Sequence, residues 1–387
     1  MKILMFSFYY APDLCAGSFR MAALVDQLKR LPGVELEIIT TMPNRYSTFK
    51  SEALPFEQHQ NVTVHRVPLP SHQSGMIDQI KAFYTYFKAA IHLTKGKQYD
   101  LVFGTSSRLF TAFLSAWVAK SKKLPLYLDV RDIFVDTIKD VLSPKIVWFM
   151  KPLLSLVEKF SFSKAEHINL VSKGFKPYFE KRYPKPSYSY FTNGIDSEFL
   201  DISESPKETK NSEAINVLYA GNIGEGQGLQ TIIPDLAKIA GEKYHFKIIG
   251  DGGRKVQLEK ACDGIKNIVL VPPVSRQELV DEYLAADVLF LHLNDYPAFK
   301  KVLPSKLFEY GAMGKPILAG VQGYAADFLN EHLSNCEVFT PNEAEQGFKA
   351  LLALEINNTE RPEFIQKFAR TNIMREMSIS IAATGQA

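Results

Sequence analysis

The chain has 387 residues, more than one hydrophobic core normally organises, so two domains are expected. Its three cysteines are odd in number and form no CxxC pair, which argues against a secreted disulfide scaffold and favours a reduced cytoplasmic protein. No stretch predicts a signal peptide or a transmembrane helix, and the net charge of +3 comes without a dense Lys/Arg run, so no nucleic-acid partner is expected.

In the first half of the chain, short apolar runs alternate with helical patterns. The runs that predict β-strands are Lys2–Phe8, Glu35–Thr41, Val62–Val67, Leu101–Gly104, Leu126–Val130, His167–Val171 and Tyr188–Thr192. The main helical patterns between them are Ser18–Leu31, Ile77–Lys95, Leu109–Lys120 and Lys145–Phe162. This alternation predicts βαβ units and a buried parallel sheet, and right-handed crossovers then give a doubly wound α/β domain.

A polar segment, Ser203–Ala214, predicts an exposed linker, and a second βαβ series follows it. Its expected strands are Asn216–Ala220, Phe246–Gly250, Ile268–Val271, Val288–Leu293, Pro316–Ala319 and Val338–Phe339. Its expected helices are Gln230–Ala240, Lys255–Ala261, Arg276–Ala286, Lys306–Met313 and Glu343–Leu354. Two such domains imply a cleft that faces the carboxyl ends of both sheets, where ligands normally bind.

Two glycine-rich turns follow strands of the second half, at Tyr219–Gly224 and Ile248–Gly253. Glycines at such turns let backbone N–H groups approach an anion, although they also occur for purely structural reasons. Neither turn is a GxGxxG fingerprint after the first strand, so an NAD-dependent dehydrogenase is a distant alternative.

The segment Pro304–Ile317 places Lys306 and Glu309 three residues apart at the start of a predicted helix. Residues three apart share a helix face, so both side chains would border the same cleft. A cation near a helix N-terminus suits phosphate, and a carboxylate one turn later suits sugar hydroxyls. The alternative is an ordinary solvated Lys–Glu pair.

The first half carries a D-x-R-D cluster, formed by Asp129, Arg131 and Asp132, at a predicted strand end. Carboxylates beside an arginine can orient a hydroxyl nucleophile or stabilise charge, although a local salt bridge that caps the next segment would look the same. Ala11–Gly17 joins the first strand to the helix that carries Arg20.

These motifs, in this order, resemble the retaining GT-B glycosyltransferases of family 4. Within that family the chain is similar to the bacterial transferases related to the L-fucosamine transferase of O-antigen and capsule assembly. The resemblance covers nearly the whole chain, and its most specific part is the last of the matching segments: Tyr9–Gly17, Asp129–Phe134, Asn193–Asp196, Ala220–Gly224, Ile249–Gly252, Ser275–Ala286 and Pro304–Pro316.

The resemblance implies transfer of a sugar, an N-acetylated hexosamine, with retained anomeric configuration and no metal or other cofactor. The donor that it favours is a UDP-sugar, with a GDP-sugar as the alternative. The acceptor would be a saccharide, free or linked to polyprenyl diphosphate, in bacterial surface polysaccharide synthesis. The fold implied is two Rossmann-like domains: residues 1–198 for the acceptor, with a return of the terminal helix at about 362–387, and residues 199–361 for the donor.

Site residues are carried over by matching motifs. Glu309 matches the second glutamate of the family's E-x7-E element, which holds the ribose, whereas Lys301 stands where the first glutamate is expected. Asn222 and Gln227 replace the Arg and Lys that usually neutralise the diphosphate, so that role shifts to Lys306, helped by Lys301 or Arg254. The expected catalytic residues are Asp132, Lys306 and Glu309. Further donor contacts are expected from Gly17, Asn222, Gly250, Gly252, Arg254, Lys301, Pro304, Ser305 and Leu307, and acceptor-side contacts from Arg20, Asp129 and Arg131.

Charge is unevenly distributed along the chain. Residues 1–195 hold 26 Lys and Arg against 15 Asp and Glu, a net +11, and the remainder holds 19 against 27, a net −8. With the amphipathic, lysine-bearing stretches Ile77–Lys97 and Lys145–Phe162, this favours an anionic membrane surface as partner, at the inner face of the plasma membrane. Scattered solubilising charge and ordinary packed helices are the alternatives.

Two other functions remain open from the residues alone. A UDP-sugar epimerase would also bind a UDP-sugar between two such domains, but it needs an acid/base array that no motif supplies. A non-catalytic nucleotide-sugar binding subunit would explain Lys301, Asn222 and Gln227, and product formation by the purified chain would distinguish it from a transferase.

Overall fold

The computed structural model describes residues 1–13, 15–44, 52–70, 76–106, 108–135, 144–200 and 214–386, so all but the last residue of the expected linker Ser203–Ala214 lies outside them. The chain forms two compact units, Met1–Asn193 with Arg370–Ala387, and Gly194–Ala369. The sequence predicted borders at 198 and about 362, whereas the observed borders are 193 and 369. The difference arises because the segments around Ile195 and Phe368 pair with each other inside the second unit. The Ile195 N–H donates to the Phe368 carbonyl at 2.8 Å, and Ile195 bridges Ala369.

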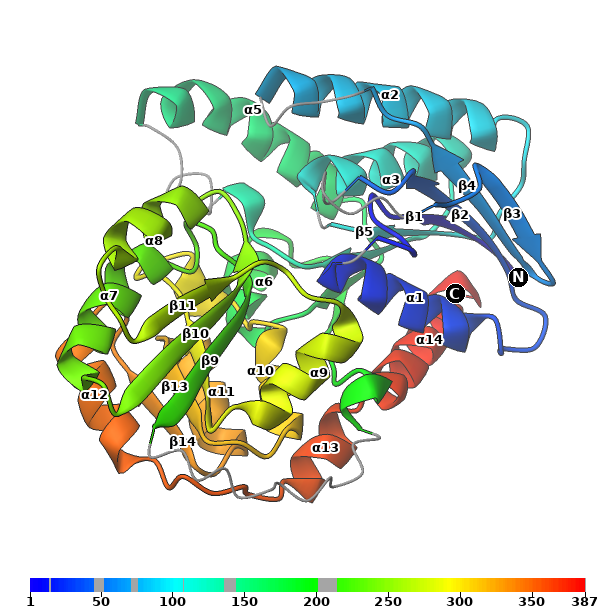
Figure 1. Ribbon diagram of the computed structural model, residues 1–387. Coiled ribbons are helices and arrows are strands. Elements are labelled where there is room, and N and C mark those ends of the chain that lie inside the picture. Colours follow the sequence, from blue (N-terminus) through cyan, green and yellow to red (C-terminus); the bar gives the residue numbers. More distant parts are fainter. Residues whose placement is uncertain are drawn as a thin grey trace. The chain divides into compact units, whose positions relative to one another are not determined.

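The first unit is built on an eight-stranded sheet in the order β3-β4-β2-β1-β5-β6-β7-β8, parallel except at β3–β4 (Figure 1). The strands are β1 (Lys2–Phe6), β2 (Glu35–Thr41), β3 (Phe56–His59), β4 (Val62–Val67), β5 (Leu101–Thr105), β6 (Leu126–Val130), β7 (His167–Leu170) and β8 (Ser187–Ser189). The sequence missed β3 because this edge strand is mostly exposed, with Phe56 51% accessible, and lacks an apolar run.

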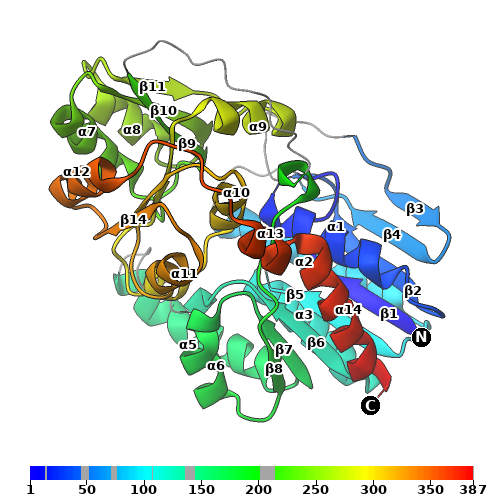
Figure 2. The same ribbon diagram turned by 90° about the horizontal axis from the view of Figure 1, so that it is seen from below.

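Helices cover both faces of this sheet. α2 (Met76–Thr94), α3 (Leu109–Lys122) and α5 (Pro144–Phe162) lie on one face, and α1 (Ala16–Leu28) and α14 (Arg370–Gln386) lie side by side on the other (Figures 1 and 2). α6 (Lys176–Arg182) follows a short 3₁₀ turn, η1 (Lys173–Phe175), and was not predicted. Among the described residues, no helix combines the length and apolar character needed to span a bilayer.

The second unit has an all-parallel six-stranded sheet in the order β11-β10-β9-β12-β13-β14. The strands are β9 (Ile215–Asn222), β10 (Tyr244–Asp251), β11 (Ile268–Val271), β12 (Val288–His292), β13 (Ile317–Gly320) and β14 (Cys336–Phe339). Both units therefore have the doubly wound α/β architecture that the sequence predicted.

Helices also flank the second sheet on both faces (Figure 1). α7 (Leu229–Ala240), α8 (Lys255–Cys262) and α12 (Ala344–Ala353) pack on one face and bury a core that includes Ile232, Leu236 and Phe290. α9 (Arg276–Ala285), α10 (Lys306–Ala312) and α11 (Tyr324–His332) lie on the other, with α13 (Pro362–Phe368) beside α10. The remaining elements are the 3₁₀ turns η2 (Ser197–Phe199) and η3 (Phe299–Lys301).

Candidate functional site

The two glycine-rich turns of the second unit lie at the ends of neighbouring strands, β9 and β10. Gly250 and Gly252 have φ of +153° and +158°, a region that favours glycine. A Cβ at Gly250 would collide with the Gly221 carbonyl oxygen, and one at Gly252 with the Ile223 carbonyl oxygen. Glycine is thus required at both positions because the two turns approach each other closely. This packing accounts for the glycines without a ligand, so their expected contact with the donor stays a prediction.

Lys306 extends from the first residue of α10 toward the end of β9. Its ammonium occupies the space that a Cβ on Gly221 would need, and it lies 5.1 Å from the centre of the Tyr219 ring. No carboxylate among the described residues forms an ion pair with it. Burial lowers the pKa of Lys306, and the nearby charge of Glu309 opposes that shift. Desolvation without an ion-pair partner makes this ammonium a ready counter-charge for an anionic ligand.

The residues around Lys306 differ in exposure. Pro304 and Ser305 are half-buried just before α10, and the Ser305 side chain makes no cap hydrogen bond. Leu307 is 1% exposed and belongs to the core, so its expected donor contact can involve only its backbone. Lys301 is half-buried at the end of η3.

Glu309 is held by two residues of α9 that the sequence did not single out. Its Oε1 accepts from Arg276 Nη1 at 3.2 Å, and its Oε2 accepts from the Tyr283 hydroxyl at 3.0 Å. The capping box of Ser275 and Glu278 that begins α9 places Arg276 in the first helical turn. Since a carboxylate has about four lone-pair sites, Glu309 keeps acceptor capacity for hydroxyl donors while its orientation is fixed.

Arg276 also binds the segment that follows the Asn193-Gly194 turn. Its Nη2 donates to Asp196 Oδ2 at 2.5 Å, and its guanidinium lies 4.7 Å from the centre of the buried Phe199 ring. Burial tends to lower the pKa of Arg276, but the charges of Glu309, Asp196 and Glu198 raise it above the ordinary value. Arg276 therefore joins the first residues of the second unit to α9 and α10.

The loop after β9 is fixed by its own side chains and by residues beyond β12. Asn222 donates from Nδ2 to Gln227 Oε1 at 2.8 Å, and its expected contact with the donor stays a prediction. Arg254 forms an ion pair with Glu225, whose other oxygen accepts from the Tyr296 hydroxyl at 2.6 Å. The hydrogen bond from Tyr296 and the charge of Arg254 lower the pKa of Glu225. Because Arg254 already has this carboxylate as its partner, it is a weaker candidate than Lys306 for binding the diphosphate.

His292, which the sequence analysis did not consider, ends β12 and holds the same loop. It is fully buried, its Nδ1 lies 2.6 Å from the Gln227 carbonyl oxygen, and its Nε2 accepts from the Asn342 N–H at 3.1 Å. Burial lowers its pKa to about 4, so the ring is neutral at pH 7. The apolar strand around it gave no signal of this role.

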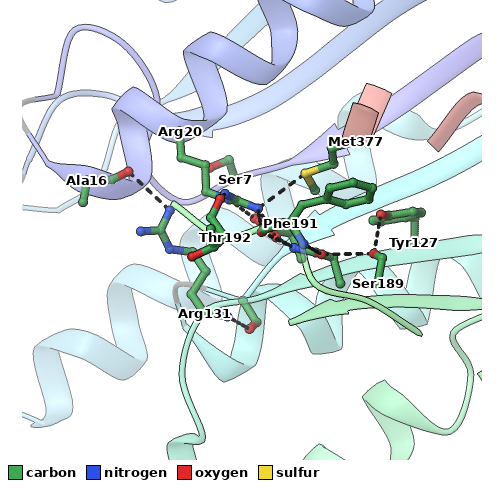
Figure 3. A network of polar contacts seen from close by, with 12 residues as sticks. Ser7, Ala16, Arg20, Tyr127, Arg131, Ser189, Phe191, Thr192 and Met377 are labelled. Atoms are coloured by element: carbon green, nitrogen blue, oxygen red, sulfur yellow. Dashed lines mark hydrogen bonds and ion pairs between the residues drawn. The ribbon is translucent and has the colours of Figure 1, made fainter. Parts of the chain in front are cut away.

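In the first unit, Arg20 and Asp129 form a buried ion pair, and Figure 3 shows Arg20 beside Phe191 and Thr192. Arg20 Nε and Nη2 donate to the two Asp129 oxygens at 2.8 and 2.9 Å, and Arg20 also donates to the Thr192 and Phe191 carbonyls. Both side chains are 2% exposed. Burial would raise the pKa of Asp129, but Arg20 brings it below the ordinary value. The hydrogen bonds of both side chains go to protein groups, and their expected acceptor-side contact stays a prediction.

Arg131, Asp132 and Gly17 lie nearer to solvent. Arg131 is half-buried and donates from Nη1 to the Ala16 carbonyl at 3.3 Å, with that nitrogen 3.6 Å from where a Cβ of Gly17 would lie. Asp132 is exposed in the loop after β6. Desolvation by the surrounding protein raises its pKa to about 6, and Arg131 opposes the shift. Because its surface reaches water, solvent screens part of this effect.

The described residues thus divide the candidate site by unit. In the second unit the fold brings Lys306, Glu309, the Gly221 turn and the unforeseen Arg276 and Tyr283 together. In the first unit, Arg131 is half-buried and Asp132 is exposed, whereas Arg20 and Asp129 are buried and paired with each other. No group of three or more His, Cys, Asp or Glu converges as metal ligands would within this described part of the chain.

Comparison with known protein families assigns both units. Residues 18–194 match the glycosyl transferase 4-like domain, and residues 201–371 match the glycosyl transferases group 1 family. The chain is a GT-B glycosyltransferase with a 4-like domain followed by a group 1 domain. The two matches leave out only short stretches at both ends and between the units, in agreement with the resemblance stated from the sequence.

Individual relatives of this glycosyltransferase are distant but nearly full-length. WcaI of Escherichia coli K12, whose name assigns it to colanic acid biosynthesis as a glycosyl transferase, is 23% identical over 97% of this chain and 98% of its own. HepE of Anabaena, solved with UDP, has a TM-score of 0.61 at 15% identity and covers 100% of this chain and 98% of its own. The UDP-forming α,α-trehalose-phosphate synthase of Burkholderia xenovorans, solved with glucose-6-phosphate, has a TM-score of 0.71 at 12% identity and covers 100% of both. These two similarities concern the fold.

Proposed function

We propose that the chain is a retaining, metal-independent glycosyltransferase that moves an N-acetylated hexosamine from a UDP-sugar to a saccharide or polyprenyl-diphosphate-linked acceptor. The observation that carries this proposal is the Lys306 ammonium, which is desolvated over the Gly221 turn without a carboxylate partner among the described residues. Bacterial surface polysaccharide synthesis is the setting, by analogy with the name of WcaI.

Each group has a distinct task in this reaction. A departing nucleoside diphosphate gains negative charge, which the Lys306 ammonium stabilises best from a site that excludes water. Glu309, fixed by Arg276 and Tyr283, accepts hydrogen bonds from the ribose hydroxyls. Asp132 orients the acceptor hydroxyl or takes its proton, because a pKa near 6 leaves it ionised at pH 7 and basic enough to bind a proton.

UDP is the favoured nucleotide because HepE was solved with UDP, and the similar trehalose-phosphate synthase is UDP-forming. The test is thermal-shift binding of the purified chain against UDP, GDP, ADP and NAD, followed by product analysis with UDP-N-acetylhexosamines. We expect UDP alone of these ligands to raise the melting temperature, because a ligand that binds the folded state stabilises it by mass action. We also expect the product analysis to show sugar transfer. Binding without any product would favour the non-catalytic subunit, and epimerised donor would favour the epimerase.

An anionic membrane surface is the further partner that we propose for the first unit. Its support is the net +11 of residues 1–195 together with exposed apolar side chains on α2 and α5, among them Ile80, Tyr84 and Trp148. Co-sedimentation with anionic vesicles tests this partner, and absence of binding would remove it without affecting sugar transfer.

A further inference from the structure

A cavity of about 570 Å³ opens in the first unit between α5, α6 and the residues that follow α6. Five cationic side chains line it: Lys151, Lys159, Lys164, Arg182 and Lys185. None of the five forms an ion pair with a carboxylate in the described ranges. So many like charges around one opening repel each other, and an anion in the cavity would relieve that repulsion.

The base of this cavity is built from a buried carboxylate and two tyrosines. Glu158 is 4% exposed, and its Oε1 accepts from the Tyr178 and Tyr183 hydroxyls, both at 2.8 Å. Arg182 stacks on Tyr178 with 3.7 Å between its guanidinium carbon and the ring centre. The one carboxylate among the described lining residues is therefore recessed and hydrogen-bonded, which leaves the opening positively charged.

Helix α5 also presents apolar side chains beside this opening. Trp148 is 81% exposed, and it shares a helix face with Ser155 and Lys159 of the cavity because they follow it by 7 and 11 residues. Leu156, adjacent to that face, is 66% exposed. Tryptophan next to lysines is typical of a membrane–water interface, where the ring lies at headgroup level and the ammonium groups meet lipid phosphates.

We infer that the cavity between α5 and α6 binds the phosphate of an anionic membrane lipid headgroup, with Trp148 and Leu156 inserted beside it. This inference rests on the membrane partner proposed above but not on sugar transfer. The five cationic side chains favour a phosphate group as the ligand. The exposed apolar side chains of α5 indicate that this phosphate belongs to a lipid.

The test uses the full chain with Trp117→Phe, so that Trp148 is the one remaining tryptophan. The cavity variant carries Lys151→Gln, Lys164→Gln and Lys185→Gln. The matched control carries Lys243→Gln, Lys260→Gln and Lys266→Gln, which removes the same charge from exposed positions of the second unit. Affinity is measured on phosphatidylcholine vesicles with and without phosphatidylglycerol, with Trp148 emission and quenching by brominated lipid as readouts.

The cavity variant should lose affinity for the anionic vesicles by about tenfold or more, since each lysine near such a surface contributes about fivefold. The control should lose markedly less, and Trp148 of the parent should shift to the blue and be quenched. Equal losses in the two variants would mean diffuse electrostatic attraction and would overturn the site. Binding of inorganic pyrophosphate is measured by calorimetry as a second readout. If the cavity variant alone lost pyrophosphate binding while both variants bound vesicles equally well, the cavity would bind a free phosphate ligand and not a lipid headgroup.

Thermal shift by UDP separates this inference from the proposed function. The cavity variant should keep the UDP-induced rise in melting temperature, because the donor groups lie in the second unit. A parent chain that responds to UDP but not to anionic vesicles would overturn the lipid site alone. A parent chain that binds vesicles through the cavity but responds to no nucleotide would leave the lipid site standing and remove the transferase proposal.

Discussion

At the scale of single residues, Lys306 carries the donor-site argument. Lys306→Met keeps the length of the side chain and removes the charge that would stabilise the leaving diphosphate. We expect kcat to fall by about 10²- to 10³-fold and UDP binding to weaken. The fold should be unharmed or slightly more stable, since the lowered pKa of Lys306 shows that the folded protein disfavours its charge.

Steady-state kinetics, UDP titration and thermal melting of the Lys306→Met variant check this expectation. Lys260→Met, at an exposed position in the last turn of α8, is the matched control and should behave as the parent. Wild-type turnover in Lys306→Met would refute the assignment of the diphosphate contact.

Asp132 gives a prediction of pH dependence. With a pKa raised to about 6, its carboxylate is mostly protonated below that pH, so a role as proton acceptor requires kcat/KM to rise up to about pH 6 and then to level off. Asp132→Asn should lower the rate at every pH and abolish this limb of the profile. A profile unchanged by the substitution would exclude Asp132 as the base.

At the scale of elements, the buried Arg20–Asp129 pair joins α1 to the end of β6, and Arg20 also contacts Met377 of α14 at 3.4 Å (Figure 3). Asp129→Asn leaves the Arg20 guanidinium buried without its counter-charge, which costs about 3–5 kcal/mol in the free energy of unfolding. Urea denaturation at pH 7 measures the loss. Asp26→Asn, which breaks surface pairs with Lys29 and Arg30, should cost less than about 1 kcal/mol.

The pH dependence of this pair has a definite sign. The pKa of Asp129 in the folded protein is below its ordinary value of 3.8, so its ionisation stabilises the fold at neutral pH. The stability difference between the parent and Asp129→Asn should therefore shrink as the pH falls through and below that value. A difference that stays constant into acid would show that Asp129 contributes shape rather than charge.

The sequence predicted those elements whose apolar pattern is strong and local. β2, β4, β6 and β11 have the expected bounds. β6 is buried along its whole length and β11 is an unbroken apolar run, whereas β4 alternates buried and half-buried residues over most of its length. β3 was missed because it is an exposed edge strand without an apolar run. α11 was missed for another reason, and α13 was predicted only as the start of one terminal helix over about 362–387, because both depend on tertiary packing: Phe328 of α11 and Phe364 of α13 are buried against Phe308 of α10. Local composition carries little of that information.

The candidate site shows the same division. The sequence correctly placed Lys306 and Glu309 three residues apart on one helix of the second unit. Arg276 lies 33 residues from Glu309 along the chain, so no local pattern could have paired them. Conversely, the D-x-R-D cluster suggested accessible chemistry at Asp129, but Arg20, 109 residues away, takes both of its oxygens.

At the scale of the whole molecule, the last helix belongs to the first unit. α14 buries Met374, Met377 and Ile381 completely, and its Ser380 lies 3.4 Å from the Tyr127 hydroxyl. Each such apolar side chain contributes about 1.5–3 kcal/mol. A chain that ends at Ala369 would lose a sum comparable to the total stability of a domain, which is about 5–15 kcal/mol, so the first unit should no longer fold cooperatively.

Differential scanning calorimetry with and without UDP tests this prediction, because the units should respond separately. In the chain that ends at Ala369, the transition of the first unit should vanish, while that of the second unit should remain and shift upward with UDP. A chain that ends at Ala383 keeps all three buried side chains and should melt like the parent. If the shorter chain kept both transitions, α14 would contribute little to the first unit. If it lost both, the folding of the second unit would depend on the first, and the donor site could not be studied apart from it.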